Sequence, residues 1–295
     1  MILDEGAVRD LLRMEDLIPV MASALADLSS GKVVQPMRVM VPIADHGGFL
    51  GLMPAYGGAL GAKLVTFYPN NQGVPTHHAV IVLFRPETGE PLVTMDGRLI
   101  TEMRTAAVSA VATKCLARPE ASVLGILGAG VQARSHLEAL RLVRTFREIR
   151  VWSPRNARAF AKQFGIRAAA SAAEAVRGAD VIVVATTSQT PVLLGEWLSP
   201  GTHINAVGAP RPTWRELDDA VLRTARIYVE SREAATRESG DVIAAGRVDA
   251  EIGEVVTRAK RGRESAGEVT LFKSVGVAIE DVATADLVYR KALGA

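Results

Sequence analysis

The stretch that most constrains the fold is residues 121–140, where a short apolar run meets a glycine-rich turn. The run 123–127 is bounded by turn residues, and the apolar residues after the turn follow helical spacing. This pattern predicts a buried strand that leads into a helix. Gly128 would permit the tight turn, Gly130 would let a pyrophosphate approach the backbone, and Ala133 would let the helix pack closely on the strand.

The surroundings of this turn favour a dinucleotide-binding unit over a purely structural turn. A glycine-rich turn alone is weak evidence in a chain with 26 glycines. Here a second apolar strand at 149–152 follows the helix where a βαβ unit requires one. The helix N-terminus would offer free N–H groups to the pyrophosphate. We therefore expect the cofactor to contact Gly128, Ala129, Gly130, Val131 and Gln132, and the strand ends Thr186 and Val207.

The end of the second strand indicates which dinucleotide binds. An acidic residue about twenty residues after the glycines prefers a free ribose 2′-hydroxyl, but no acid occurs between Trp152 and Arg158. Ser153, Arg155 and Arg158 could instead surround a 2′-phosphate, because guanidinium groups match phosphate oxygens. We therefore expect NADPH, with Asn156 among the contacts and NADH as the alternative. A solvated basic helix start is the other interpretation.

The remaining pattern predicts two kinds of sheet. After a helix at 15–28, alternation with a period of two predicts antiparallel strands at 37–41, 48–53, 59–68, 77–84 and 91–95. A helix at 101–116 leads to the glycine-rich unit. Beyond that unit, apolar strands at 180–186, 203–207, 227–230 and 268–272 alternate with helices, and a helix at 275–292 ends the chain. The expected fold class is α/β, with a Rossmann-type doubly wound parallel sheet beside an α+β domain.

Composition excludes several classes of partner. The net charge of +2 comes from 34 basic and 32 acidic residues that are interspersed, which gives no field suited to nucleic acid or anionic membranes. The single cysteine, Cys115, excludes an internal disulfide and is expected to be a small buried hydrophobe. The first residues carry acids where a secretory signal carries bases, and no apolar run reaches the length of a membrane span. We expect a cytoplasmic protein.

Three cationic residues are candidates for the chemistry. Strand alternation places Lys63 on the face shared with Val65 and Phe67, where desolvation lowers the pKa of an ammonium toward that of a proton donor near neutral pH. The alternative is a lysine at a sheet edge whose charge prevents aggregation with another chain. Arg38 and Arg104 could each clamp a carboxylate, although surface arginines are the simpler interpretation of each alone.

The histidines do not predict a metal site. His77 and His78 are adjacent in a predicted strand, so they point to opposite faces and cannot bind one metal together. One of them, with Thr76, could approach the cofactor. The other three histidines have no partner at ligand spacing, and we expect no metal. No motif for nucleophilic catalysis occurs.

Several separated stretches resemble the ornithine cyclodeaminase/mu-crystallin family. They are residues 63–66 (KLVT), 73–77 (GVPTH), 103–107 (MRTAA), 128–133 (GAGVQA), 195–201 (GEWLSPG), 203–208 (HINAVG) and 272–276 (FKSVG). The resemblance implies a substrate-binding and dimerisation domain from residues 1–117 and 278–295, an inserted NADP-binding Rossmann domain at 118–277, and a homodimer assembled through the substrate-domain sheets. It also implies that Arg38, Lys63 and Arg104 lie at the substrate, Arg104 also toward the nicotinamide, and that Thr76, His77, Ser153 and Ser274 lie near the cofactor.

One departure from the family pattern narrows the expected reaction. Cyclodeaminases and related amino-acid dehydrogenases carry an aspartate shortly after the strand at 203–207, but no carboxylate lies between Gly208 and Glu216 here. Releasing ammonia or oxidising an amino acid would need a base at that point, whereas reducing a preformed C=N bond needs only a hydride and one proton.

The resemblance then implies a ketimine reductase that converts Δ1-pyrroline-2-carboxylate or Δ1-piperideine-2-carboxylate to L-proline or L-pipecolate. Arg38 would hold the carboxylate and Lys63 would protonate the imine. The alternatives are an alanine-type dehydrogenase, an ornithine cyclodeaminase, and an NADPH-dependent binding protein for a small ligand such as thyroid hormone. The sequence does not separate the two ring sizes or the physiological pathway.

Overall fold

The computed structural model describes residues 1–294, which form two compact units. Of the described residues, the first unit comprises 1–104 and 276–294, and the second comprises Thr105–Val275. Helix α3, Arg98–Leu116, contains the first boundary within its length. The sequence predicts domain limits at 117/118, just after that helix, and at 277/278, at the start of the last helix.

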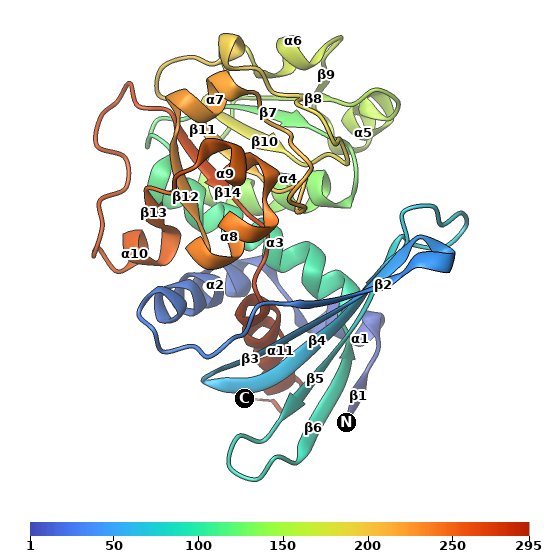
Figure 1. The fold of residues 1–295 in the computed structure, drawn as a ribbon. Helices are drawn as coiled ribbons and strands as arrows, with labels where there is room; N and C mark the ends of the chain where they lie inside the picture. Colours follow the sequence, from blue (N-terminus) through green and yellow to red (C-terminus); the bar gives the residue numbers. More distant parts are fainter. Residues whose placement is uncertain (295) are drawn as a thin grey trace. The chain divides into compact units, whose positions relative to one another are not determined.

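The first unit contains a six-stranded sheet in the order β1-β6-β5-β4-β3-β2 (Figure 1). Its strands are β1 (Ile2–Leu3), β2 (Val39–Ile43), β3 (Gly48–Gly57), β4 (Ala59–Phe67), β5 (His77–Phe84) and β6 (Pro91–Asp96). Strands β2 to β6 pair antiparallel, as predicted. Strand β3 continues four residues beyond the predicted end, because Gly57 still pairs with Ala59 and Gly58 alone, at φ +77°, makes the turn.

Helices cover one face of this sheet. They are α1 (Glu5–Leu11), α2 (Met14–Ser29) and α11 (Ala278–Ala292), with a short 3₁₀ turn η1 at Ala44–His46. Helix α11, dark red in Figure 1, packs on β3, β4 and β5. Its Val282 side chain lies over Gly61, where an added Cβ would press against the Val82 carbonyl oxygen at 2.6 Å, so the helix can approach the strands closely.

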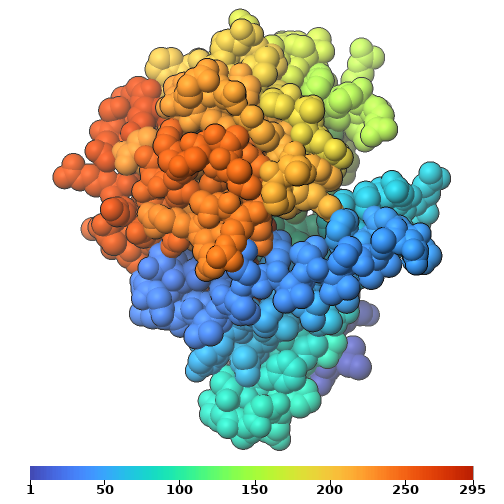
Figure 2. Space-filling model, viewed as in Figure 1, coloured from blue at the N-terminus to red at the C-terminus, as the bar shows by residue number. Residues whose placement is uncertain are grey.

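The opposite face of the sheet is open and apolar. Val39 on β2, Leu64 on β4 and Val80 on β5 are 56%, 38% and 44% exposed. Leu64 pairs directly with Val80 across the two strands, so these side chains share that face. At one end of the sheet, η1 and the β4–β5 loop lie side by side (Figure 2), and the Tyr68 ring packs against Gly48.

The second unit contains an eight-stranded parallel sheet in the order β13-β12-β14-β11-β10-β7-β8-β9. Its strands are β7 (Val123–Leu127), β8 (Glu148–Trp152), β9 (Arg167–Ala168), β10 (Val181–Val184), β11 (His203–Ala206), β12 (Arg226–Val229), β13 (Ala250–Glu251) and β14 (Thr270–Lys273). The chain runs outward from β7 through β8 to β9, then returns to the other side of β7 at β10. This reversal is the switch point of a doubly wound sheet, which confirms the predicted fold class.

Seven helices and a short 3₁₀ turn belong to the described part of this unit besides α3. They are α4 (Val131–Val143), α5 (Ala157–Phe164), α6 (Ala172–Val176), α7 (Asp219–Thr224), α8 (Arg232–Glu238), α9 (Gly240–Ala245) and α10 (Ile252–Val256), and the turn is η2 (Gly195–Trp197). Strands β7, β10, β11 and β14 are buried at every residue, which explains the continuous apolar sequences of β7 and β10. Cys115 is only partly buried, and burial raises the pKa of its thiol.

Two helix starts differ from the predicted ones for local reasons. Helix α3 begins at Arg98 because the Asp96 carboxylate accepts a hydrogen bond from the Arg98 backbone N–H at 2.9 Å. Helix α11 begins at Ala278 because Gly276 adopts φ +73° and Val277 is extended. In residues 1–294 no helix has both the length and the apolar character that a membrane crossing requires.

Candidate active site

In the first unit, Lys63 is a buried cation in an apolar setting. It lies in the middle of β4, between Met53 on β3 and Ile81 on β5, and its side chain is 2% exposed. The Lys63 Nζ lies 2.6 Å from Oδ2 of Asp281, in the first turn of α11. The predicted placement on the buried face is therefore correct, and the lysine is one half of a buried ion pair.

Arg104 shares the same carboxylate. Its Nε donates to Oδ1 of Asp281 at 3.1 Å, and its NH1 donates to Oε2 of Glu280 at 2.6 Å. Arg104 is 5% exposed, and both carboxylates are fully buried. Asp281 therefore bridges Lys63 and Arg104, one oxygen to each.

Arg38 joins this group through the loop before α11. Its NH2 donates to the Gly276 carbonyl oxygen at 2.6 Å. Gly276 also packs against the Arg104 guanidinium so closely that a side chain at this position would collide with it. The three cations predicted from the sequence, Arg38, Lys63 and Arg104, are thus brought together around one strand and one helix start.

Burial and charge shift the acid–base properties of this cluster. Desolvation lowers the pKa of Lys63 to about 8, with Arg104 and Arg38 adding to the decrease and Asp281 opposing it. Burial alone would raise the pKa of Asp281, but the Arg104 guanidinium and the Lys63 ammonium outweigh it, and the pKa is lowered. At neutral pH the cluster therefore holds a charged lysine that can release its proton, beside guanidinium groups suited to a carboxylate.

In the second unit, the glycine turn after β7 has the geometry of a phosphate cradle. Gly128 adopts φ +118°, and a side chain there would collide with the Ala185 carbonyl. An added Cβ at Gly130 would meet nothing within 4 Å, so the backbone is open on this side. Gly130 is the N-cap of α4 and offers no side-chain cap, which leaves the first N–H groups of the helix for an anion.

The other expected cofactor residues of this unit lie along the same sheet edge. Ser153 follows β8, Thr186 follows β10, Val207 follows β11 and Ser274 follows β14, and these strands and β7 are consecutive in the sheet. Arg155 and Asn156 are exposed in the turn after β8. The Gly128 N–H donates to the Trp152 carbonyl at 2.8 Å, which joins the glycine turn to that strand end. The residues at this edge therefore fit an extended dinucleotide across the switch point.

A second buried ion cluster lies beneath this edge. Oε1 of Glu216 accepts from the Thr186 backbone N–H at 2.8 Å and from its hydroxyl at 2.6 Å. The Lys273 Nζ lies 3.2 Å from Oδ2 of Asp241 and 3.9 Å from Oε2 of Glu216, and it donates to the Gly208 carbonyl. Burial raises the pKa of Glu216 to about 7, Lys273 and Thr186 oppose the rise, and Asp241 adds to it.

Sequence reasoning missed the carboxylate partners in both clusters. It treated Glu216 as the first acid after a gap, but the chain folds back and places this carboxylate directly against Gly208. It did not consider Glu280 and Asp281. The available signal was an acidic pair inside an otherwise apolar helix start, where Ile279 and Val282 flank the two acids and are buried. Acids that stand between buried residues of a helix are themselves buried, and buried carboxylates need cationic or hydrogen-bonding partners.

Some expected residues lie outside these clusters. Thr76 and His77 are in the exposed end of the first unit's sheet, where the Thr76 hydroxyl lies 3.2 Å from His77 Nδ1 and the His77 ring stacks on Phe67 at 4.4 Å. His136 is buried against Ser109, and burial lowers its pKa to about 4, so it is a neutral structural residue. Within the part of the chain that the structure describes, no three potential ligands are grouped as a metal site would need.

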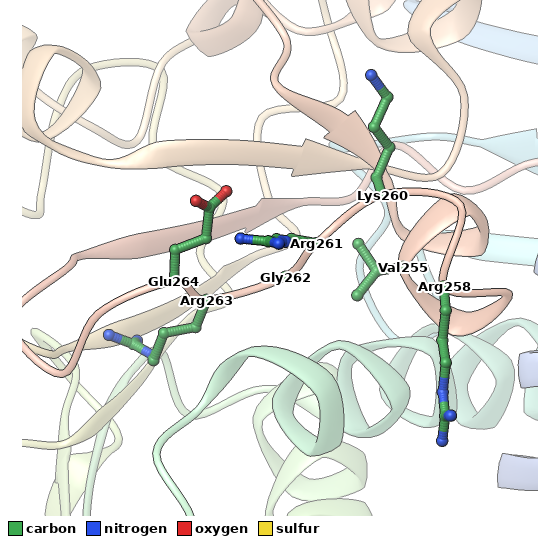
Figure 3. A pocket seen from close by; sticks show the side chains of 7 residues that line it. All are labelled: Val255, Arg258, Lys260, Arg261, Gly262, Arg263 and Glu264. Carbon is green, nitrogen blue, oxygen red and sulfur yellow. The ribbon is translucent and has the colours of Figure 1, made fainter.

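A basic depression in the second unit does not form a site of this kind. Arg258, Lys260, Arg261 and Arg263 line it, but their side chains point in different directions (Figure 3). The Arg263 guanidinium is hydrogen-bonded within the protein, because its Nε donates to the Leu116 carbonyl at 2.7 Å and its NH2 to the Thr270 hydroxyl at 3.0 Å. The basic side chains of this depression therefore do not converge on one position where an anion could bind.

A doubly wound sheet with a glycine turn at its switch point is the architecture of dinucleotide-binding proteins, and here it is joined to an α+β unit that buries a lysine near two arginines. A model of the ornithine cyclodeaminase/mu-crystallin family matches residues 1–295. The ketimine reductase mu-crystallin of Mus musculus is 51% identical over 296 residues, covering 96% of this chain and 94% of the relative. The chain belongs to the ornithine cyclodeaminase/mu-crystallin family, which confirms the resemblance.

Two solved structures are similar throughout. The Δ1-pyrroline-2-carboxylate reductase of Thermococcus litoralis, in complex with NADH and L-proline, has a TM-score of 0.95 and 42% identity, covering 100% of this chain and 98% of that one. An archaeal alanine dehydrogenase dimer with bound NAD has a TM-score of 0.94 and 39% identity, covering 100% and 96%. Both units of the chain therefore have counterparts in proteins whose structures hold a nicotinamide cofactor.

Proposed function

We propose that this protein reduces small cyclic ketimine carboxylates, Δ1-pyrroline-2-carboxylate or Δ1-piperideine-2-carboxylate, to L-proline or L-pipecolate with NADPH or NADH. The observation that carries the proposal is the buried Lys63, whose pKa of about 8 suits a proton donor, beside Arg38 and Arg104. The cations Arg38, Lys63 and Arg104 and the carboxylates Glu280 and Asp281 have a formal net charge of +1. That charge fits a substrate with one carboxylate. The similarity to a ketimine reductase and to a pyrroline-carboxylate reductase supports the same reaction.

The residues of the first unit divide the work on the substrate. Arg38 binds the substrate carboxylate, with Arg104 assisting on that side or toward the nicotinamide. Lys63 gives one proton to the imine nitrogen, which makes the adjacent carbon a better hydride acceptor and leaves a neutral amine at Lys63. The product gains one proton at nitrogen and one hydride at carbon, and Lys63 recovers its proton from water.

The sheet edge of the second unit holds the cofactor in this proposal. When bound, the reduced nicotinamide supplies the hydride. Gly128, Ala129, Gly130, Val131 and Gln132 hold the pyrophosphate on the α4 N-terminus. Ser153, Arg155 and Asn156 contact the adenosine ribose, and Thr186, Val207 and Ser274 line the strand ends toward the nicotinamide. Thr76 and His77 stay candidates for the same cofactor from the first unit.

A substrate panel with purified protein tests the proposal. NADPH and NADH oxidation at 340 nm is followed with both cyclic imines, with pyruvate plus ammonia, and with ornithine assayed separately for ammonia release. Turnover of a cyclic imine at least tenfold above the other substrates is the expected result. Preference for pyruvate plus ammonia would identify an alanine-type dehydrogenase, and ammonia release from ornithine a cyclodeaminase. Tight NADPH binding without any turnover would identify a ligand-binding protein.

We further propose that the protein is a cytoplasmic homodimer assembled through the first unit's sheet. The open apolar face around Leu64 and Val80 supports this assembly, because such a face is costly in water. Light scattering of the native protein is expected to give twice the chain mass. Leu64→Glu would place a charge in the interface and give monomers, whereas Leu142→Glu, at a residue of α4 that is 46% exposed, would not. A monomeric native protein would contradict the proposal.

A further inference from the structure

We propose that Asp281 is a positioning residue for catalysis, whose carboxylate holds the Lys63 ammonium with one oxygen and the Arg104 guanidinium with the other, and so keeps Lys63 in its proton-giving form. The role in turnover rests on the proposed function. The coupling between Asp281 and Lys63 is a property of the folded chain that can be measured without any substrate.

The first argument is geometric. Lys63 projects from the central part of a sheet strand, where pairing on both sides fixes its backbone. Among the described residues, Asp281 provides the ion pair of this ammonium, at 2.6 Å. The other oxygen of the same carboxylate accepts from Arg104 Nε at 3.1 Å. Rotation of the Asp281 side chain would therefore disturb both cations. The contact with Arg104 holds the carboxylate in the orientation that it needs to contact Lys63, and the contact with Lys63 does the same for Arg104.

The second argument concerns charge. The charged groups that act on Lys63 are Asp281 from α11, Arg104 from α3, and Arg38 from the segment before β2, and Glu280 from α11 pairs with Arg104. Burial and the two guanidinium groups all favour a neutral lysine. Glu280 accepts a hydrogen bond from Arg104 NH1, and Asp281 is in contact with the ammonium. Without the Asp281 charge, Lys63 would lose its proton at a lower pH and would enter the reaction as a neutral amine.

The third argument is the position of Asp281 in its helix. Asp281 lies in the first turn of α11, where the helix dipole favours a negative charge. The cations and the helix therefore keep the carboxylate ionised while Lys63 changes its charge. After Lys63 has given a proton to the imine nitrogen, this negative charge favours the return of a proton from water to the amine, and the cluster regains its starting charge.

Direct titration of Lys63 tests the proposal. The chain has seven lysines, so protein labelled with ¹³C at the lysine ε-carbon gives a small set of resonances, and Lys63→Met identifies the one from Lys63. In the native protein its midpoint is expected at about pH 8. In Asp281→Asn the midpoint is expected to fall by about one to three pH units. Asp286→Asn, on the same helix and paired with Arg290, is the matched control and should leave the midpoint unchanged.

The outcomes separate this proposal from the proposed function. An unchanged Lys63 midpoint in Asp281→Asn overturns the positioning role, whether or not the enzyme reduces a ketimine. A shifted midpoint supports the coupling even if no ketimine is turned over, in which case only the proposed function fails. In an active enzyme, the pH at which kcat declines should move down together with the midpoint, whereas a merely structural defect would lower kcat at every pH.

If Asp281→Asn does not fold, Asp281→Glu serves as the second variant. It keeps the charge but displaces it by one methylene. The Lys63 midpoint should then stay within about one pH unit of the native value while kcat falls, because the charge is kept and the alignment is lost. A midpoint lowered by more than that, or an unchanged kcat in a protein that reduces ketimines, would overturn the positioning role.

Discussion

The two units each bury a lysine against carboxylates, and the two clusters differ in their balance of charge. In the first unit, Arg38, Lys63 and Arg104 are grouped with Glu280 and Asp281, so three cations meet two acids. In the second unit, Lys273 is the cation that pairs with Glu216 and Asp241 among residues 1–294. The group that titrates near neutral pH is accordingly the base in the first cluster and an acid in the second: Lys63 at about 8 and Glu216 at about 7.

In the proposed function, this difference separates a reactive cluster from a structural one. The first places its lysine beside arginines that can bind a carboxylate, so its proton can be used. The second directs its groups at the backbone: Glu216 holds the Thr186 N–H, Asp241 accepts from the Glu216 and Leu217 N–H groups, and Lys273 holds the Gly208 carbonyl. Its effect is to fix the strand ends on which a cofactor would rest.

The largest expected effect comes from Lys63→Met. Removal of the proton donor should lower kcat by about 10²- to 10⁴-fold, the usual contribution of a general acid. Binding of NADPH, measured by its fluorescence, should be retained, because the glycine turn belongs to the other unit. Lys32→Met, at an exposed lysine of the first unit, is the control. Near-normal kcat in Lys63→Met would exclude Lys63 as the proton donor. The first cluster would then be structural, like the second.

The same substitution in the second unit should act on stability. Lys273→Met leaves Glu216 and Asp241 buried together without their cation, which costs roughly 3–5 kcal/mol in the free energy of unfolding. Lys63→Met should cost less, because Arg104 still faces both acids of its cluster. Urea unfolding of the two variants at one pH compares them directly. Equal losses would mean that both lysines have the same structural role.

Glu216→Gln should remove a pH dependence of stability. The pKa of Glu216 in the folded chain, about 7, lies above its ordinary value of 4.5, so the folded state binds this proton more tightly than the unfolded state. Stability from this group is therefore complete at low pH and is lost as pH rises to about 7, by an amount on the order of 3 kcal/mol. Urea unfolding at pH 5 and pH 8 should show this loss in the native protein and not in Glu216→Gln. The same change in unfolding free energy between pH 5 and pH 8 in both proteins would contradict the raised pKa of Glu216.

The smallest effect is expected at the exposed edge of the second unit. Arg155→Asp should weaken NADPH binding relative to NADH by about tenfold, because an aspartate repels the 2′-phosphate and accepts from the 2′-hydroxyl. Unfolding free energy should be unchanged, in contrast to Lys273→Met. Arg158→Asp tests whether the next arginine shares the role. An unchanged preference for NADPH in Arg155→Asp would refute this assignment of the cofactor contact.

Local signals allowed much of the architecture to be predicted. The turn at Gly128, the alternation around Lys63 and the apolar strands β7 and β10 each depend on residues close together in the sequence, and the structure contains them. The partners of the buried cations could not be found in this way. Asp281 meets Arg104 across 177 residues, and Glu216 reaches Thr186 across 30. An acid in the first turn of a helix is already favoured by the helix dipole, so its presence in the sequence does not indicate a distant cationic partner.

The late position of α11 in the chain has a consequence for biosynthesis. Strands β3 to β6 and Arg104 leave the ribosome long before the acids that neutralise them, so the half-made sheet holds Lys63 with no carboxylate to receive it. Closure of the first unit must wait for the last helix. A nascent chain that stalls before residue 280 therefore leaves uncovered the sheet face on which α11 packs, and exposed apolar surface of this kind makes a partly folded chain prone to aggregation.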